Sequence, residues 1–213
     1  MTLITLFFKT FVGFFAVMDP IGSIPVFVIM TDNNTEPERR SMVRRASITA
    51  LGVLLFFGIT QMWLFNFFGF TMGAFRVAGG LFLFLIAFEM LSAQFSGAKH
   101  THEEQKEGVE KPDISITPLA VPLLAGPATI ASVVLAFSQA EDFWQYVAVA
   151  VATVAVCVAS WFILRASGRI QKLLGMTGIK VVSRMMGLIL AAMAIQFVAA
   201  GLSELFPILA SKP

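Results

Sequence analysis

Six apolar segments, each long enough to cross a bilayer as a helix, divide the chain. They cover residues 3–31, 46–68, 72–93, 114–138, 143–165 and 180–206. A membrane-spanning helix needs about 20 mostly apolar residues. Only 13% of the 213 residues are charged and 57% are hydrophobic, whereas an ordinary soluble domain has roughly 25% charged residues. The sequence therefore predicts an all-α membrane protein with six transmembrane helices.

The basic residues fall in alternate connections between these segments. The second and fourth connections contain no Lys or Arg. Because cytoplasmic loops carry the excess of Lys and Arg, we expect both termini to lie on the outer, periplasmic side. Lys9 and Lys212 run against this distribution but are outnumbered. The basic residues of the first, third and fifth connections are Arg39, Arg40, Arg44, Arg45, Lys99, Lys106, Lys111, Arg165, Arg169, Lys172 and Lys180.

The third connection is the longest polar stretch and divides the chain in two. We predict a first three-helix repeat at 1–95, a cytoplasmic polar loop at 96–113 and a second three-helix repeat at 114–213. His100, His102, Glu103 and Glu104 lie in the loop, and these residue types can bind a metal. Because nothing nearby would fix their geometry, we favour a flexible hydrophilic linker and predict no metal site.

The two halves resemble each other at two places. "RVAGG" begins at Arg76 and "RMMG" at Arg184, each followed by a long apolar stretch. "DPIGSI" (19–24) aligns with "GPATIA" (126–131). Three spans in each half require the second half to be inverted in the membrane. We therefore predict two inverted three-helix repeats.

Proline and glycine interrupt the first and fourth spans. Proline removes a helix hydrogen bond, and a freed backbone group in lipid must be satisfied by protein or water. We expect Asp19 to be an N-cap and Pro20 the first residue of a second half-helix. In the fourth span, one half-helix should end near Ala125-Gly126 and another should start at Pro127.

Both new helix starts would aim unsatisfied N–H groups at the interior of the membrane. Such groups suit an anion, above all a carboxylate. The alternative is that the prolines bend the helices for packing and that Asp19 is only a cap. The predicted substrate-binding residues are Asp19, Pro20, Ile21, Gly22, Ser23, Gly126, Pro127, Ala128 and Thr129.

Few polar side chains lie inside the predicted spans, and such residues usually face the protein interior or water. Arginines near the start of a span can instead extend to the interface, and Gln196 or Thr129 can join helices by hydrogen bonds. The candidates for coupling or gating are Asp19, Arg76, Glu89, Arg184 and Gln196.

Two observations argue against catalysis. No predicted span contains His, and we find no Ser/His or paired-carboxylate arrangement. The nucleotide motif GxxxxGK[ST] is missing, so we expect no ATP drive within this chain. We predict no enzyme activity and no cofactor. The one cysteine, Cys157, lies in an apolar run and fits a core position.

The segments "MDPIGSIPVF", "RVAGGLFLFLIA", "PLAVPLLAGPATIA" and "SRMMGLILAAMAIQF" resemble the MarC family of six-span bacterial inner-membrane proteins. The resemblance covers nearly the whole chain. It implies location in the plasma membrane, two inverted three-helix repeats and, for some members, uptake or exchange of small neutral amino acids such as glycine and alanine. Some relatives carry Asn in place of Asp19. The residues that match the two signature segments are Asp19, Pro20, Gly22, Pro122, Gly126 and Pro127.

We therefore expect a secondary transporter for small neutral amino acids or similar zwitterions, working by alternating access in the lipid bilayer. Proton or sodium coupling and an oligomeric state are compatible with the sequence, and no nucleic-acid partner is expected. The alternative is a membrane packing or assembly protein without a transport cycle.

Overall fold

The structure is a computed structural model that describes residues 2–92 and 113–206. Every element of secondary structure in those residues is helical. The elements are α1 (Leu3–Met18), α2 (Ile24–Met30), α3 (Glu36–Phe68), α4 (Met72–Ser92), η1 (Ser115–Leu124), α6 (Pro127–Ser138), α7 (Phe143–Arg165) and α8 (Ser167–Leu205).

Four of the described helices, α3, α4, α7 and α8, are long and apolar enough to cross a membrane. The pair η1 and α6 makes a fifth if it counts as one span bent by 58°. The predicted first span, 3–31, is divided into the short helices α1 and α2. The all-α fold is therefore confirmed for the described residues, which contain four to five candidate spans. The six-span inverted repeat stays a prediction, as does the predicted division into 1–95, 96–113 and 114–213.

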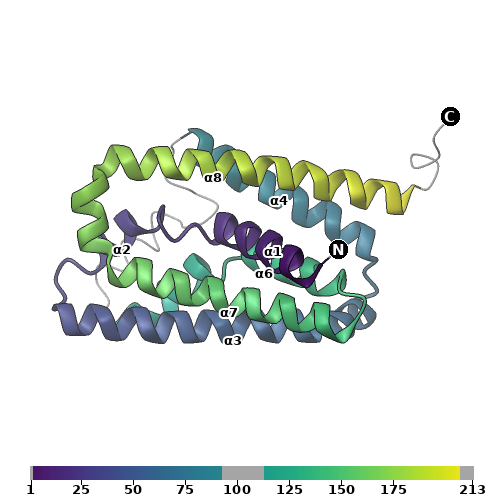
Figure 1. Ribbon diagram of the computed structural model, residues 1–213, viewed down its shortest axis with the longest axis horizontal. Helices are drawn as coiled ribbons and strands as arrows, with labels where there is room; N and C mark the ends of the chain where they lie inside the picture. Colours follow the sequence, from purple (N-terminus) through teal and green to yellow (C-terminus); the bar gives the residue numbers. More distant parts are fainter. Residues whose placement is uncertain (1, 93–112, 207–213) are drawn as a thin grey trace.

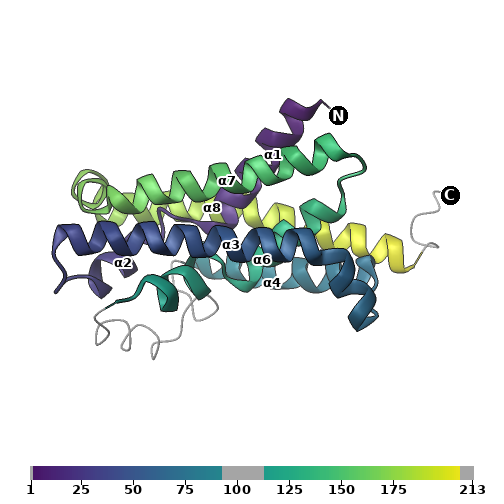
Figure 2. The ribbon, with the colours of Figure 1, turned by 90° about the horizontal axis from the view of Figure 1, so that it is seen from below.

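The helices form three layers (Figure 1). The pair α4 and α8 lies on one side and the pair α3 and α7 on the other, with α1 and α6 between them. Figure 2 shows that α1 is inclined to the long helices. The end of α1 and the start of α6 thus lie between the two pairs, where protein atoms can satisfy or cover their backbone.

Small residues repeat every seven positions on α4 and α8, which run antiparallel. Gly73, Gly80 and Ala87 lie on α4, opposite Gly201, Ala194 and Gly187 on α8. A Cβ added to Gly201 would lie 2.7 Å from the carbonyl oxygen of Gly73. Such closeness between backbones is typical of membrane helices that associate through small residues.

Helices α3 and α8 begin about ten residues or more before the spans predicted at 46 and 180. At the start of α3, the backbone N–H of Thr35 donates to the Glu38 carboxylate at 2.7 Å, in a capping box that the sequence analysis missed. The start of α8 turns at Gly175, whose φ of 63° favours glycine. The segment before Gly175 runs across the end of the bundle (Figure 1).

The same end of the bundle carries the start of α3 and the junction of α7 with α8 (Figure 1). These two places contain the basic residues of the first and fifth connections. The start of α1 and the end of α8 lie toward the opposite end. The histidines and lysines of the third connection lie outside the described residues.

Two ion pairs join segments that are distant in sequence. Arg45 of α3 lies 3.0 Å from Asp113, just before η1. Arg76 of α4 lies 2.8 Å from Glu204 of α8. Each pair therefore connects the first half of the chain to the second.

We expect Gly201→Ala to lower the free energy of unfolding by about 1–3 kcal/mol, because the added methyl meets backbone atoms that cannot rotate away. Gly52→Ala is the matched control, since a Cβ there meets no atom within 4 Å and alanine is the better helix former. Thermal unfolding in detergent would measure both. Equal losses for the two variants would contradict close packing between α4 and α8.

A second prediction concerns Asp113. Hydrogen bonds from the Ser115 hydroxyl and backbone N–H, assisted by Arg45, hold the pKa of the Asp113 carboxyl below its usual value. Its contribution to stability is therefore present above its unfolded pKa of about 3.9 and is lost as the pH falls through the lower folded pKa. Because the Arg45 pair is exposed, Asp113→Ala should cost at most about 1 kcal/mol at neutral pH.

The measurement for Asp113 is the thermal unfolding midpoint from pH 7 to pH 3. The wild type should lose more stability over this range than Asp113→Ala does. Parallel curves for the two proteins would show that the carboxylate contributes nothing.

Candidate substrate site at the helix breaks

The first break is organised by Asp19, whose side chain is buried. Asp19 has a φ of 43°, in the left-handed region that Asp and Asn tolerate better than most residues. Its backbone N–H donates to the carbonyl of Phe15 at 3.0 Å and closes α1. Its carboxylate accepts from the backbone N–H of Gly22 at 3.0 Å. One residue thus ends a helix and holds the turn that follows.

The prediction that Asp19 is the N-cap of a helix beginning at Pro20 is wrong. Asp19 is the C-cap of α1, and α2 begins at Ile24 after a turn. Ser23 precedes α2, and its hydroxyl donates to the Asp19 carbonyl at 2.9 Å. The physical reason is that the left-handed backbone at Asp19 ends α1, so that a turn separates the two helices.

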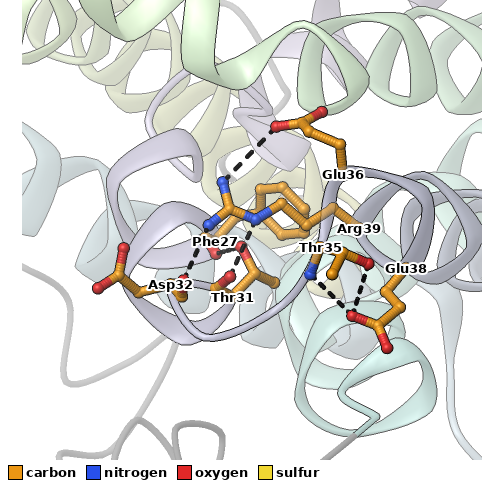
Figure 3. A network of polar contacts seen from close by, with 7 residues as sticks. All are labelled: Phe27, Thr31, Asp32, Thr35, Glu36, Glu38 and Arg39. Atoms are coloured by element: carbon orange, nitrogen blue, oxygen red, sulfur yellow. Dashed lines mark hydrogen bonds and ion pairs between the residues drawn. The ribbon is translucent and has the colours of Figure 1, made fainter.

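Arg39 fixes the far end of α2 (Figure 3). Its guanidinium donates to the backbone carbonyls of Thr31 at 2.9 Å and Asp32 at 3.4 Å, and lies 3.9 Å from the Glu36 carboxylate. A basic side chain at the C-terminal carbonyls of a helix satisfies them. The arginine predicted only as a cytoplasmic charge therefore also joins α2 to α3.

The second break follows the prediction closely. Helix η1 ends at Leu124, Gly126 precedes the new helix with extended backbone, and α6 starts at Pro127. Thr117 and Val121 also have extended backbone, as expected for residues that precede proline. The hydrogen bonds of η1 include Ala125 N–H to the Ala120 carbonyl at 2.8 Å.

Two residues in the first turn of α6 are buried. Ala128 is 2% and Thr129 3% exposed, and N–H groups in the first turn of a helix have no carbonyl partner within it. Ala128 packs in one buried cluster with Val17, near the end of α1. The end of α1 and the start of α6 are therefore neighbours inside the protein.

Helix α8 covers the turn of the first break. A Cβ added to Gly22 would lie 2.0 Å from a carboxylate oxygen of Asp19 and 2.6 Å from the hydroxyl of Ser183 on α8. A side chain at position 22 would therefore displace the Asp19 carboxylate and the Ser183 hydroxyl. Sequence analysis did not single out Ser183, and a serine in a long helix gives no signal by itself.

The candidates for coupling or gating do not form one cluster with the breaks. Arg76 is paired with Glu204, which sequence analysis missed. Glu89 is half-buried on α4, whereas Arg184 is exposed on α8. Gln196 lines a cavity, and of the five only Asp19 belongs to a break.

This cavity, of about 890 Å³, lies between α1, α6, α7 and α8. Sequence analysis missed it. The signal available was Lys9, a charge inside an apolar segment. Apart from Gln196, none of the predicted site residues lines the cavity, although Ser132, one turn after Thr129, does. Polar side chains at its wall are Thr5, Lys9, Thr10, Ser132, Gln139, Gln145 and Gln196.

The model of the MarC family integral membrane proteins matches residues 4–206. This chain belongs to the MarC family. The match includes both breaks and the long helices around them, so the breaks lie within the region that the family model describes.

Curated relatives cover almost the full chain. A UPF0056 membrane protein of Bacillus subtilis, YvbG, is 39% identical over 94% of this chain and 96% of its own. A UPF0056 membrane protein of Pyrococcus abyssi is 37% identical over 93% and 94%, and YhcE of Escherichia coli is 33% identical over 94% of each chain. No solved structure matches the chain.

We expect Asp19→Asn to retain the stability of the wild type within about 0.5 kcal/mol, since Asn can accept the Gly22 N–H and tolerates the left-handed backbone. Asp19→Ala should cost about 1–2 kcal/mol, because it removes the acceptor from the partly buried N–H of Gly22. Thermal unfolding of the three proteins at neutral pH tests this. A loss for Asp19→Asn equal to that for Asp19→Ala would show that the negative charge is required.

Proposed function

We propose that this MarC-family protein is a transporter of small neutral amino acids or similar small zwitterions in the bacterial inner membrane, with both termini on the periplasmic side. In this proposal the chain comprises two inverted three-helix repeats that alternate the access of one substrate site. A proton or sodium gradient drives the cycle, and the protein has no catalytic activity.

The observation that carries the proposal is that the end of α1 and the start of α6, each next to a helix break, are buried in one cluster. The end of α1 and the start of α6 share the cluster of Val17 and Ala128, between two pairs of long helices (Figure 1). Irregular backbone at membrane depth is tolerated where it is buried in protein or lines an aqueous cavity. Transporters built from repeats hold substrate at such discontinuous helices near the midplane.

The chemistry of the breaks suits a zwitterion. The unpaired N–H groups at the start of α6 favour a carboxylate, and the Asp19 carboxylate or the carbonyls of the turn provide acceptors for an ammonium group. The side chains around both breaks are small, at Gly22, Ser23, Gly126 and Ala128. A small solute therefore fits this site better than a large one.

A flux measurement tests the proposal. Purified protein in liposomes should accumulate labelled glycine, alanine or serine in response to a proton or sodium gradient. Gly126→Ala should reduce this flux at least tenfold, because its Cβ would lie 2.6 Å from the Pro122 carbonyl oxygen and would disturb the start of α6. Gly52→Ala is the control that should transport normally.

The alternative, a packing or assembly protein, predicts a different result. Folded wild-type protein would then move none of the three amino acids under either gradient. That outcome, with intact protein confirmed by its thermal unfolding transition, would overturn the transport proposal.

A further inference from the structure

The cavity beside α1 has a distinctive charge. Among the described residues that line it, Lys9 is the only one with a charged side chain. Lys9 is exposed, although α1 is otherwise an apolar helix. Ionisable residues within membrane segments usually face water or a functional pathway. The cavity therefore explains why Lys9 lies within the first predicted span, away from the connections that hold most of the basic residues.

A second observation also indicates a ligand or water in the cavity. The hydroxyl oxygen of Ser132 is buried and has no hydrogen-bond partner, and Ser132 lines the cavity. A buried polar atom without a partner costs about 1–3 kcal/mol unless a ligand or water supplies one. Thr10 and Gln196 contribute further hydrogen-bonding groups from α1 and α8.

The size of the cavity distinguishes it from a tight binding site. At about 30 Å³ for each water molecule, a volume of about 890 Å³ holds on the order of thirty waters. That is far more room than one small amino acid fills. The cavity extends from Thr5 near the N-terminus to Ser132, one turn beyond Thr129 of the second break.

We infer that this cavity is a vestibule that attracts and binds the carboxylate group of a small solute through the ammonium group of Lys9, on its way to the helix breaks. The inference rests on the proposed function, in which that solute is a small amino acid. Lys9 supplies the charge, and Thr10, Ser132 and Gln196 supply hydrogen bonds. A charge within a cleft of low-dielectric walls raises the local concentration of counter-ions.

Two acidic residues lie near the cavity, and their electrostatic effect must be distinguished from that of Lys9. The Gln145 amide donates to Asp142 at 3.0 Å, and its carbonyl accepts from the backbone N–H of Glu141. Neither acidic residue lines the cavity. A substitution at Lys9 leaves Asp142 and Glu141 in place. The difference between the Lys9 variants and the wild type therefore measures the contribution of Lys9 alone.

The test uses single-cysteine variants of the full chain in detergent, in a Cys157→Ala background. Gln196→Cys places a thiol in the cavity, and Thr71→Cys places an exposed one between α3 and α4. An anionic and a cationic methanethiosulfonate are reacted with each. The ratio of anionic to cationic rates should be about tenfold higher for Gln196→Cys than for Thr71→Cys, at the low end of electrostatic effects on association rates.

Variants of Lys9 then test whether this residue causes the preference for the anionic reagent. Lys9→Met should remove the tenfold preference and Lys9→Arg should keep it, with all variants checked for an intact thermal transition. Glycine, alanine and acetate should slow the modification of Gln196→Cys, whereas methylamine should not. Equal ratios at the two thiols, or a preference that survives Lys9→Met, would overturn the inference.

The outcomes separate the two proposals. A lysine-dependent preference with carboxylate protection, but no flux in liposomes, would support the vestibule and overturn transport. Gradient-driven flux without a lysine-dependent preference would support transport and overturn the vestibule. Protection by a fatty acid but not by acetate or glycine would show that the cavity binds lipid chains, and would also overturn the inference.

Discussion

The structure depends on one constraint: backbone groups freed by a helix break must be satisfied or covered away from lipid. At the first break, the Asp19 carboxylate accepts from Gly22 N–H and the Asp19 carbonyl accepts from Ser23. At the second, Gly126 and Pro127 start a new helix whose next residues, Ala128 and Thr129, are buried. In hydrocarbon each unsatisfied group would cost several kcal/mol, so both breaks require helices around them.

The surrounding helices meet this requirement through small residues. Without a hydrophobic driving force in lipid, membrane helices associate by close packing. The backbones of α4 and α8 approach at Gly80 and Gly201, and α1 approaches α8 where a Cβ on Gly13 would lie 2.8 Å from Met193. Met193 also lines the cavity with Lys9. The packing that encloses the breaks therefore also forms the wall of the proposed vestibule.

Several charged side chains also have structural partners between helices. Arg39 satisfies the carbonyls at the end of α2, and Arg76 is paired with Glu204 between α4 and α8. Both have structural partners, which weakens the case for Arg76 as a gating residue. Lys9 differs because it lies at a cavity wall, where an ammonium group can remain hydrated.

The sequence by itself determined the class of protein, the positions of both breaks and the small side chains around them. Long apolar segments and the placement of Pro20, Gly126 and Pro127 carry that information locally, because proline and glycine act on their own backbone. The exact helix starts required the structure, since the left-handed turn at Asp19 and the capping box of Thr35 depend on local hydrogen bonds.

Only the tertiary structure decided which distant residues meet. The cluster that contains Val17 and Ala128, the cover of Gly22 by Ser183, the pair of Arg76 with Glu204 and the cavity around Lys9 all join segments more than 100 residues apart. No local pattern specifies such contacts. They follow from how whole helices pack, which is a property of the complete set of side chains rather than of any one segment.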